Sequence, residues 1–242
     1  MPSKADRERT ASEQWIQETL EHRSRPRLLD LFCGAGGATR GYQLAGFHVT
    51  GVDLSPQPNY CGEVFHQADA LTFPLEGFDA IHASPPCQAY SVTRKAWNGR
   101  EDHPDLVSPV RKRLEAAGLP YIIENVVGAP LRNPIQLCGS SFGLDVRRHR
   151  LFESNVPMWA SPCAHHLQRV GRFPALRSGR ETLATVVGVF GTGGGAAKDI
   201  SLWREAMGID WMATKGELAE SIPPAFTEYL GRQLIARLHT AA

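Results

Sequence analysis

The 242-residue sequence contains no apolar run long enough to cross a membrane, and no apolar segment of the signal-peptide type follows its polar N-terminus. We therefore expect a cytoplasmic protein without membrane contact. Repeats and extended low-complexity tracts are also missing. Hydrophobic residues make up 42% and charged residues 21%, a balance typical of a folded domain. This length predicts one main domain with a sizeable core and a small added lobe.

The sequence also has almost no excess of positive over negative charge. The formal net charge is only +1, so any contact with nucleic acid would depend on local basic clusters. Residues 111–113 form one such cluster, and a second lies between residues 161 and 180, which contain no acidic residue. The arginines of the second cluster are Arg169, Arg172, Arg177 and Arg180. Either cluster is equally well explained as a solvated surface.

The five cysteines form neither a disulfide framework nor a paired CxxC pattern. Cys163, His165 and His166 have the chemistry of zinc ligands. No partner pair follows at the spacing of a zinc finger, so we expect no metal site.

Short apolar runs alternate with helical patterns in the first half of the chain. The patterns predict strands at 27–32, 47–55, 78–84 and 119–126, and helices at about 12–22, 38–46 and 106–118. This alternation predicts an α/β fold, a doubly wound and mostly parallel sheet with helices on both faces. Ligands of such sheets bind beyond the carboxyl ends of the strands.

The second half has a different texture. Residues 155–198 are rich in proline and glycine and predict an irregular lobe, whose run TVVGVF (185–190) is expected to complete the core sheet. Residues 221–238 begin with prolines and predict a closing amphipathic helix. We therefore divide the chain into an N-terminal helix and linker (1–26), a main domain (27–154), the lobe (155–198) and C-terminal helices that complete the main domain (199–242).

Two features at expected strand ends carry chemistry. The glycine-rich turn DLFCGAGG (30–37) allows a ligand to approach the backbone closely. The alternative is a tight turn that binds no ligand. Asp53, at the next strand end, has a carboxylate that suits ribose hydroxyls. Cys87 follows two prolines at a later strand end, where a buried structural cysteine would be unusual. Glu124 and Asn125 arrive at the same edge from the next strand.

Taken in order, DLFCGAGG, Asp53, PPCQ, ENV, the Arg148-x-Arg150 pair and the terminal SIPP helix resemble the C5 cytosine methyltransferases of DNA, in a small member with a shortened recognition region. The resemblance spans about residue 27 to the C-terminus. It implies a Rossmann-like domain that binds S-adenosylmethionine and methylates a cytosine flipped out of duplex DNA. A monomer is expected.

The resemblance also implies roles for individual residues. Cys87 would add to carbon 6 of cytosine, Glu124 would hold ring N3, Arg148 and Arg150 would hold the base oxygen, and Asn125 would brace the loop that carries Cys87. The residues implied in cofactor binding are Phe32, Gly34, Gly36, Gly37, Asp53, Leu54, Asp69 and Pro85. The alternative for Asp69 is a simple surface acid at a strand end.

Two positions depart from the family pattern. Val146 replaces a glutamine near the arginine pair, and Ala219-Glu220 replaces the usual Gly-Asn before the last helix. Three alternatives to DNA methylation remain: the same chemistry on RNA, a non-catalytic module that binds nucleic acid or cofactor, and transfer of a modified one-carbon group. The small lobe predicts a short or degenerate target sequence.

Overall fold

A computed structural model describes residues 25–88, 90, 104–168, 172–173, 182–183, 186–189 and 199–241. The helix expected at about 12–22 lies outside these residues, as do Arg169, Arg177 and Arg180 of the second basic cluster. Arg172 falls in a short strand whose side chains are outside the description.

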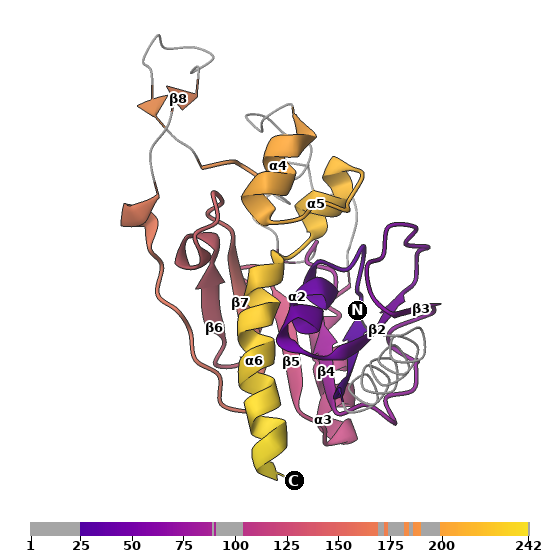
Figure 1. The fold of residues 1–242 in the computed structure, drawn as a ribbon. Helices are drawn as coiled ribbons and strands as arrows, with labels where there is room; N and C mark the ends of the chain where they lie inside the picture. Colours follow the sequence, from indigo (N-terminus) through magenta and orange to yellow (C-terminus); the bar gives the residue numbers. More distant parts are fainter. Residues whose placement is uncertain are drawn as a thin grey trace, which may run out of the picture.

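The core of the molecule is a seven-stranded sheet in the order β3-β2-β1-β4-β5-β7-β6 (Figure 1). Neighbouring strands from β3 to β5 are parallel, and β7 runs antiparallel to both β5 and β6. The strands are β1 (Arg27–Leu31), β2 (His48–Asp53), β3 (Val64–Gln67), β4 (Ala80–Ala83), β5 (Tyr121–Asn125), β6 (Ile135–Cys138) and β7 (His149–Ser154). The predicted doubly wound, mostly parallel sheet is thus confirmed.

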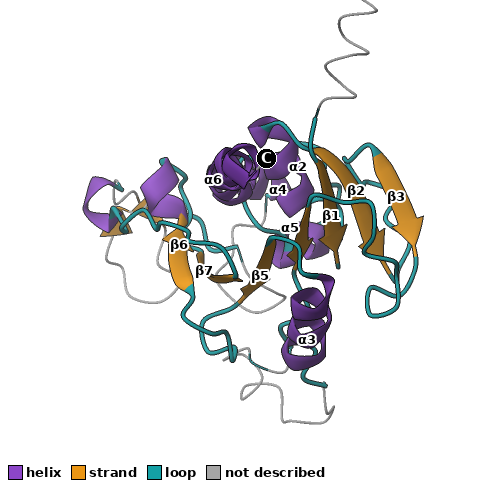
Figure 2. Cartoon of the chain, turned by 90° about the horizontal axis from the view of Figure 1, so that it is seen from below, coloured by secondary structure: helices purple, strands orange, loops and turns teal. Residues whose placement is uncertain are grey.

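Helices cover both faces of this sheet, with α2 and α6 on one face and α3 on the other (Figure 2). Apolar side chains of β1 alternate between the two layers, because successive strand residues point to opposite faces. Leu28 packs with Tyr42 of α2 and Phe226 of α6, whereas Leu29 packs with Leu114 of α3. The helices are α2 (Gly37–Ala45), α3 (Val107–Ala117), α4 (Ile200–Met207), α5 (Lys215–Glu220) and α6 (Pro224–Ala241), with 3-10 turns η2 (Gly139–Phe142) and η3 (His165–Leu167).

Two expectations about the second half and the basic clusters are wrong. The described part of TVVGVF, residues 186–189, forms no strand, and β6 and β7 complete the sheet instead. The strands β8 (Arg172–Phe173) and β9 (Thr182–Leu183) pair only with each other in a separate sheet. Arg111, expected in a basic surface cluster, is buried and pairs with Glu153 at 2.6 Å, so it joins α3 to β7 rather than facing a ligand.

Asp30 of β1 is fully buried in this core. Its Oδ2 accepts a hydrogen bond from Thr39 at 2.5 Å, while Oδ1 has no partner among the described residues. Burial, which outweighs the hydrogen bond from Thr39, raises the pKa of Asp30 to about 7. Below about pH 4 the carboxyl is neutral in both folded and unfolded chains. Between about pH 4 and pH 7 only the folded state keeps the proton, so stability falls as pH rises.

Asp30→Asn should remove this pH dependence. We expect the free energy of unfolding of the unmodified protein to fall by up to about 1.4 kcal/mol per pH unit in that window through Asp30, and the variant to lack this slope. Urea unfolding at about pH 4.5 and about pH 7.5 measures the difference. Asp79→Asn, which changes an exposed carboxylate, is the control. A slope in Asp30→Asn equal to that of the unmodified protein would contradict the prediction.

Candidate active site

The carboxyl ends of β1, β2, β4 and β5 meet at one edge of the sheet, because these strands are parallel. Helices α4 and α5 lie beyond this edge (Figure 1). The polar residues singled out in the sequence follow these strand ends, so the fold brings them to the same side of the molecule.

Cys87 lies just after β4, on the loop Ser84-Pro85-Pro86. Its side chain is half-buried. Asn125, at the end of β5, donates a hydrogen bond from Nδ2 to the carbonyl of Pro85 at 2.8 Å. Because Asn125 and Pro85 are both buried, this bond fixes the loop that carries the thiol to the neighbouring strand. The role that the resemblance implies for Asn125 stays a prediction, and this bond is the contact through which Asn125 would brace the loop.

Glu124 and Arg150 form an ion pair beside Cys87. Arg150 Nε lies 3.0 Å from Glu124 Oε1, and the two side chains are only 15% and 8% exposed. Burial raises the pKa of Glu124 above its ordinary value, although Arg150, Arg148 and a hydrogen bond from Ser84 act in the opposite direction. A carboxyl with a raised pKa can carry a proton nearer to neutral pH, as a general acid requires.

Charges of the same cluster act on the thiol. Burial and the negative charge of Glu124 raise the pKa of Cys87, and the positive charges of Arg150 and Arg148 lower it. Because the net effect raises the pKa of Cys87, the thiol is mainly in its protonated form. The thiolate would need more positive charge, or less negative charge, near the sulfur. Neutralisation of Glu124 would favour the thiolate.

Arg148 plays a different part from Arg150. It is buried, and its guanidinium donates to the carbonyl of Val189 at 2.8 Å and to the carbonyl of Ala219 in α5. Nε has no partner in the described part of the chain. Burial and the nearby Arg150 lower the pKa of Arg148 to about 9. In this structure Arg148 thus joins the chain just before β7 to two distant segments.

Arg148→Met should loosen those two segments without unfolding the domain. Each segment loses one hydrogen bond to a buried carbonyl, worth about 1 kcal/mol, so amide exchange should accelerate about fivefold in residues 186–189 and in α5. Hydrogen–deuterium exchange followed by mass spectrometry measures this, with α3 as the internal reference. Arg148→Lys keeps the charge but not the two-armed guanidinium, and should also accelerate exchange. Unchanged exchange rates in both variants would show that the two hydrogen bonds do not stabilise these segments.

A buried polar chain behind Glu124 was not predicted from the sequence. Tyr42 Oη lies 2.9 Å from His82 Nδ1, and His82 Nε2 lies 2.8 Å from Ser84 Oγ. Burial lowers the pKa of His82 to about 3, so the ring is neutral and has one donor and one acceptor nitrogen. An ionised Glu124 can only accept from Ser84, so Ser84 accepts from His82 and Tyr42 donates to His82. When Glu124 is ionised, all three donors therefore point toward it.

The three glycines of the turn after β1 differ in their surroundings. A Cβ at Gly36 would lie 2.7 Å from Cys61 Sγ, and one at Gly37 would lie 2.6 Å from the Ile222 carbonyl before α6. These two glycines are needed for packing within the chain. A Cβ at Gly34 would meet nothing within 4 Å, so only Gly34 opens onto free space. Phe32 beside it is half-buried and has a positive φ of 61°.

The acidic residues expected to bind cofactor already have partners in the backbone. Asp53 accepts from the amide of Gly34 at 3.0 Å and from that of Ser55 at 2.9 Å, so it braces the turn and keeps spare lone pairs. Leu54 next to it is 72% exposed, an apolar surface at the strand end. Asp69 is exposed and accepts from the amide of Leu71 at 2.8 Å, as in a simple turn. Pro85 is buried.

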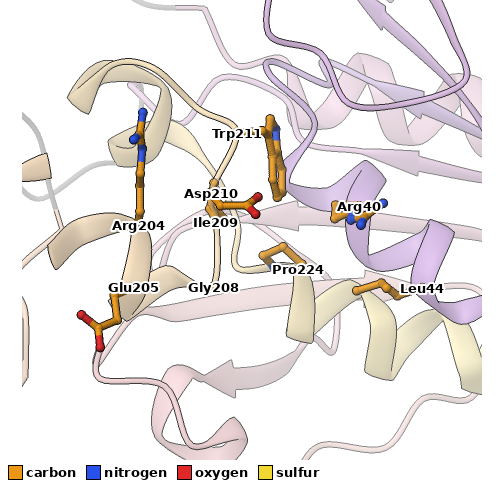
Figure 3. A pocket seen from close by; sticks show the side chains of 9 residues that line it. All are labelled: Arg40, Leu44, Arg204, Glu205, Gly208, Ile209, Asp210, Trp211 and Pro224. Atoms are coloured by element: carbon orange, nitrogen blue, oxygen red, sulfur yellow. The ribbon is translucent and has the colours of Figure 1, made fainter. Parts of the chain in front are cut away.

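A hollow of about 370 Å³ lies elsewhere, between α2, the end of α4 and the start of α6 (Figure 3). Its wall includes Arg40, Asp210 and Trp211. Trp211 donates to the carbonyl of Ala35 at 2.9 Å, which ties this wall to the back of the glycine turn. None of its lining residues belongs to the Cys87 cluster, so we assign it no part in catalysis.

No protein-family model and no curated protein matches the chain. Solved structures do match it. A candidate DNA modification methyltransferase from an E. coli prophage has a TM-score of 0.58 at 14% identity, over 89% of this chain and 99% of the other. The S. pombe Dnmt2 methyltransferase has a TM-score of 0.57 at 16% identity, over 88% and 99%. The Entamoeba histolytica methyltransferase EhMeth has a TM-score of 0.54 at 14% identity, over 89% and 99%.

The chain has a methyltransferase fold. The match extends over nearly the full length of each of these three proteins, which agrees with the resemblance read from the ordered motifs. At identities of 14–16% the agreement concerns the architecture of the methyltransferase fold. Within the described part of the chain, no helix combines the length and the apolar character that a membrane crossing requires.

Proposed function

We propose that this protein uses S-adenosylmethionine to methylate carbon 5 of cytosine in duplex DNA, with Cys87 as the covalent nucleophile. The observation that carries the proposal is the cluster of Cys87, Glu124 and Arg150 at adjoining ends of β4, β5 and β7. A thiol, a buried acid and a guanidinium in mutual electrostatic contact are the groups that nucleophilic addition to a pyrimidine needs. The methyltransferase fold supplies a matching framework.

The strand ends beside this cluster fit the cofactor. Open space at Gly34, the half-buried ring of Phe32 and the exposed Leu54 can receive a ligand with apolar and polar parts. Asp53, held by two backbone amides, can accept from ribose hydroxyls with its remaining lone pairs. Gly36 and Gly37 support the turn from behind. When bound, the cofactor would supply an electrophilic methyl group on a sulfonium.

The reaction begins at Cys87. Its thiolate adds to carbon 6 of cytosine, and the electron pair of the 5,6 double bond becomes available at carbon 5. Glu124 donates a proton or a strong hydrogen bond to ring N3, which accepts the charge that the addition produces. Arg150 holds Glu124 and faces the same space, so its remaining donors can bind the base oxygen. After transfer, a base from solvent takes the carbon-5 proton, the freed electron pair re-forms the 5,6 double bond, and the bond from carbon 6 to sulfur breaks to release the thiolate.

Attack by the thiolate must come perpendicular to the base plane. In a duplex that face is covered by stacked neighbours, so the target cytosine must leave the helix. The segment 155–198 is proposed to contact the DNA. Its arginines at 169–180 fall outside the described residues or side chains, and their contribution stays a prediction.

The deciding experiment supplies the purified protein with S-adenosylmethionine labelled in the methyl group and with either duplex DNA or RNA. The nucleic acid is then digested to nucleosides and analysed by mass spectrometry. We expect label in 5-methylcytosine from DNA. Label found only in RNA would mean that the same reaction acts on RNA instead of DNA. Label in neither nucleic acid would refute the proposal. When a cell extract replaces the purified cofactor, the group added to the nucleic acid should still have the mass of methyl and no larger mass.

A further inference from the structure

Four side chains with metal-ligand chemistry converge on the far side of β7 from the candidate active site. They are Cys138, His149, Cys163 and His165, and their ligand atoms all lie within 4.8 Å of one another. Cys138 Sγ is 3.2 Å from His165 Nε2, and Cys163 Sγ is 3.4 Å from His149 Nε2. The rings of His149 and His165 stand edge to face, with their centroids 5.3 Å apart.

The fold explains why these residues meet. Cys138 ends β6 and His149 begins β7, and the antiparallel register places them opposite each other. Cys163 and His165 come from the segment that returns past β6 after β7 has ended, with His165 at the start of η3. The ligands thus arise from three separate segments. Sequence spacing, which pointed to no metal, could not show this arrangement.

We propose that this cluster is a structural zinc site. Zinc prefers four ligands in a tetrahedron and takes thiolate sulfur at about 2.3 Å and imidazole nitrogen at about 2.0–2.1 Å, so ligand atoms are separated by about 3.3–3.8 Å. The two measured sulfur–nitrogen distances, 3.2 and 3.4 Å, lie close to that range. Two thiolates also balance the charge of the ion. Four protein ligands fill the coordination sphere and leave no position for substrate.

A neighbouring hydroxyl supports the site. Ser140 Oγ donates to Cys138 Sγ at 3.1 Å and accepts from the amide of Ala164 at 3.0 Å. It therefore links the buried cysteine to the segment that carries Cys163 and His165. Groups in this position orient metal ligands and stabilise the charge on a thiolate sulfur.

The place of the site indicates what the metal does. It fastens residues 161–168, the start of the segment proposed to contact DNA, onto the edge of the sheet. His149 is also the residue before Arg150 in β7, so a bond from zinc to His149 restrains the strand that carries Arg150. The inference does not depend on the methylation proposal, because metal content is measured without any substrate.

The test is the metal content of the full chain, purified through a tag without histidine. We expect about one zinc ion per chain by mass spectrometry of the elements. Replacement by Co²⁺ should give visible bands of tetrahedral cobalt and a near-ultraviolet band of thiolate-to-cobalt charge transfer. Absence of zinc together with absence of these bands on adding Co²⁺ to the reduced protein would overturn the proposal. A native mass two hydrogens lighter, from a Cys138–Cys163 disulfide, would also overturn it.

Variants localise the ion. Cys163→Ser and His165→Ala change residues at the surface end of the cluster, and each should weaken zinc binding at least about tenfold in competition with a chromophoric chelator. His166→Ala changes the exposed neighbouring histidine, which is outside the cluster, and should retain zinc fully. Circular dichroism checks the fold of each variant. Equal zinc content in the His166 and the two ligand variants would show that the ion binds elsewhere.

Discussion

Cys87→Ser is expected to abolish methyl transfer while cofactor affinity stays nearly unchanged. The thiol is held just after β4 by the bond between Asn125 and the Pro85 carbonyl, and no atom of the described residues beyond its chain neighbours lies within 4 Å of a Cβ placed on Gly34 in the proposed cofactor turn. Serine preserves the size of the side chain, but a hydroxyl is far less acidic than a thiol and a weaker nucleophile toward carbon 6. Loss of the nucleophile should lower the single-turnover rate at least about 10⁴-fold.

Calorimetry with S-adenosylmethionine measures the cofactor side of this prediction, and transfer of labelled methyl to DNA measures the chemistry. Cys87→Ala provides the matched control, because it removes the hydroxyl as well. If the hydroxyl of serine cannot replace the thiol, the two variants should be equally inactive. Substantial activity in either variant would contradict covalent catalysis by Cys87.

A trapping experiment tests the same bond directly. Duplex DNA with 5-fluorocytosine at the target position should form a stable covalent adduct with the unmodified protein. The adduct persists because fluorine cannot leave carbon 5 as a proton does, so the thiolate is not expelled. Peptide mapping should place the modified base on Cys87. An adduct on another residue, or its persistence in Cys87→Ser, would assign the nucleophile elsewhere.

Strands flanked by glycine and proline were the part of the fold that could be predicted. β1, β2, β4 and β5 are apolar runs buried on both faces, which is the pattern that parallel strands require. β7 escaped prediction because it carries buried charge. Glu153 is matched by Arg111 and Arg150 by Glu124, so tertiary partners make a polar sequence suitable for the sheet.

The candidate site shows the same division. Cys87, Glu124 and Asn125 could be predicted to meet because they follow adjacent parallel strands, where topology brings side chains to one edge. The separate roles of the two arginines could not be predicted. Arg148 is held by hydrogen bonds to the carbonyls of Val189 and Ala219, which lie far away along the chain. Contacts of that kind depend on how distant segments pack, and local sequence patterns carry no information about them.

Glu124→Gln should slow methyl transfer about 10²–10⁴-fold, the usual contribution of a general acid or base. DNA affinity should fall much less if the acid acts mainly in the transition state. Glutamine keeps the shape of the side chain and can still bond to Ser84, but it can neither deliver a proton to N3 nor pair as an anion with Arg150. Single-turnover rates and affinity for the same duplex separate the two effects. Equal losses in both would make Glu124 a binding residue.

The same variant has a second readout that needs no substrate, because the negative charge of Glu124 raises the pKa of Cys87. Removal of that charge should lower the pKa of the thiol, so iodoacetamide should alkylate Cys87 faster at a fixed pH near neutrality. Arg150→Gln is the matched control of opposite sign, because Arg150 lowers the pKa of the thiol and its removal should slow alkylation. Glu124→Gln would then be the variant with the more reactive thiol and the slower methyl transfer. That combination separates the supply of thiolate from the delivery of a proton to the base. Unchanged or slower alkylation in Glu124→Gln would contradict the proposed electrostatic effect of Glu124 on the thiol.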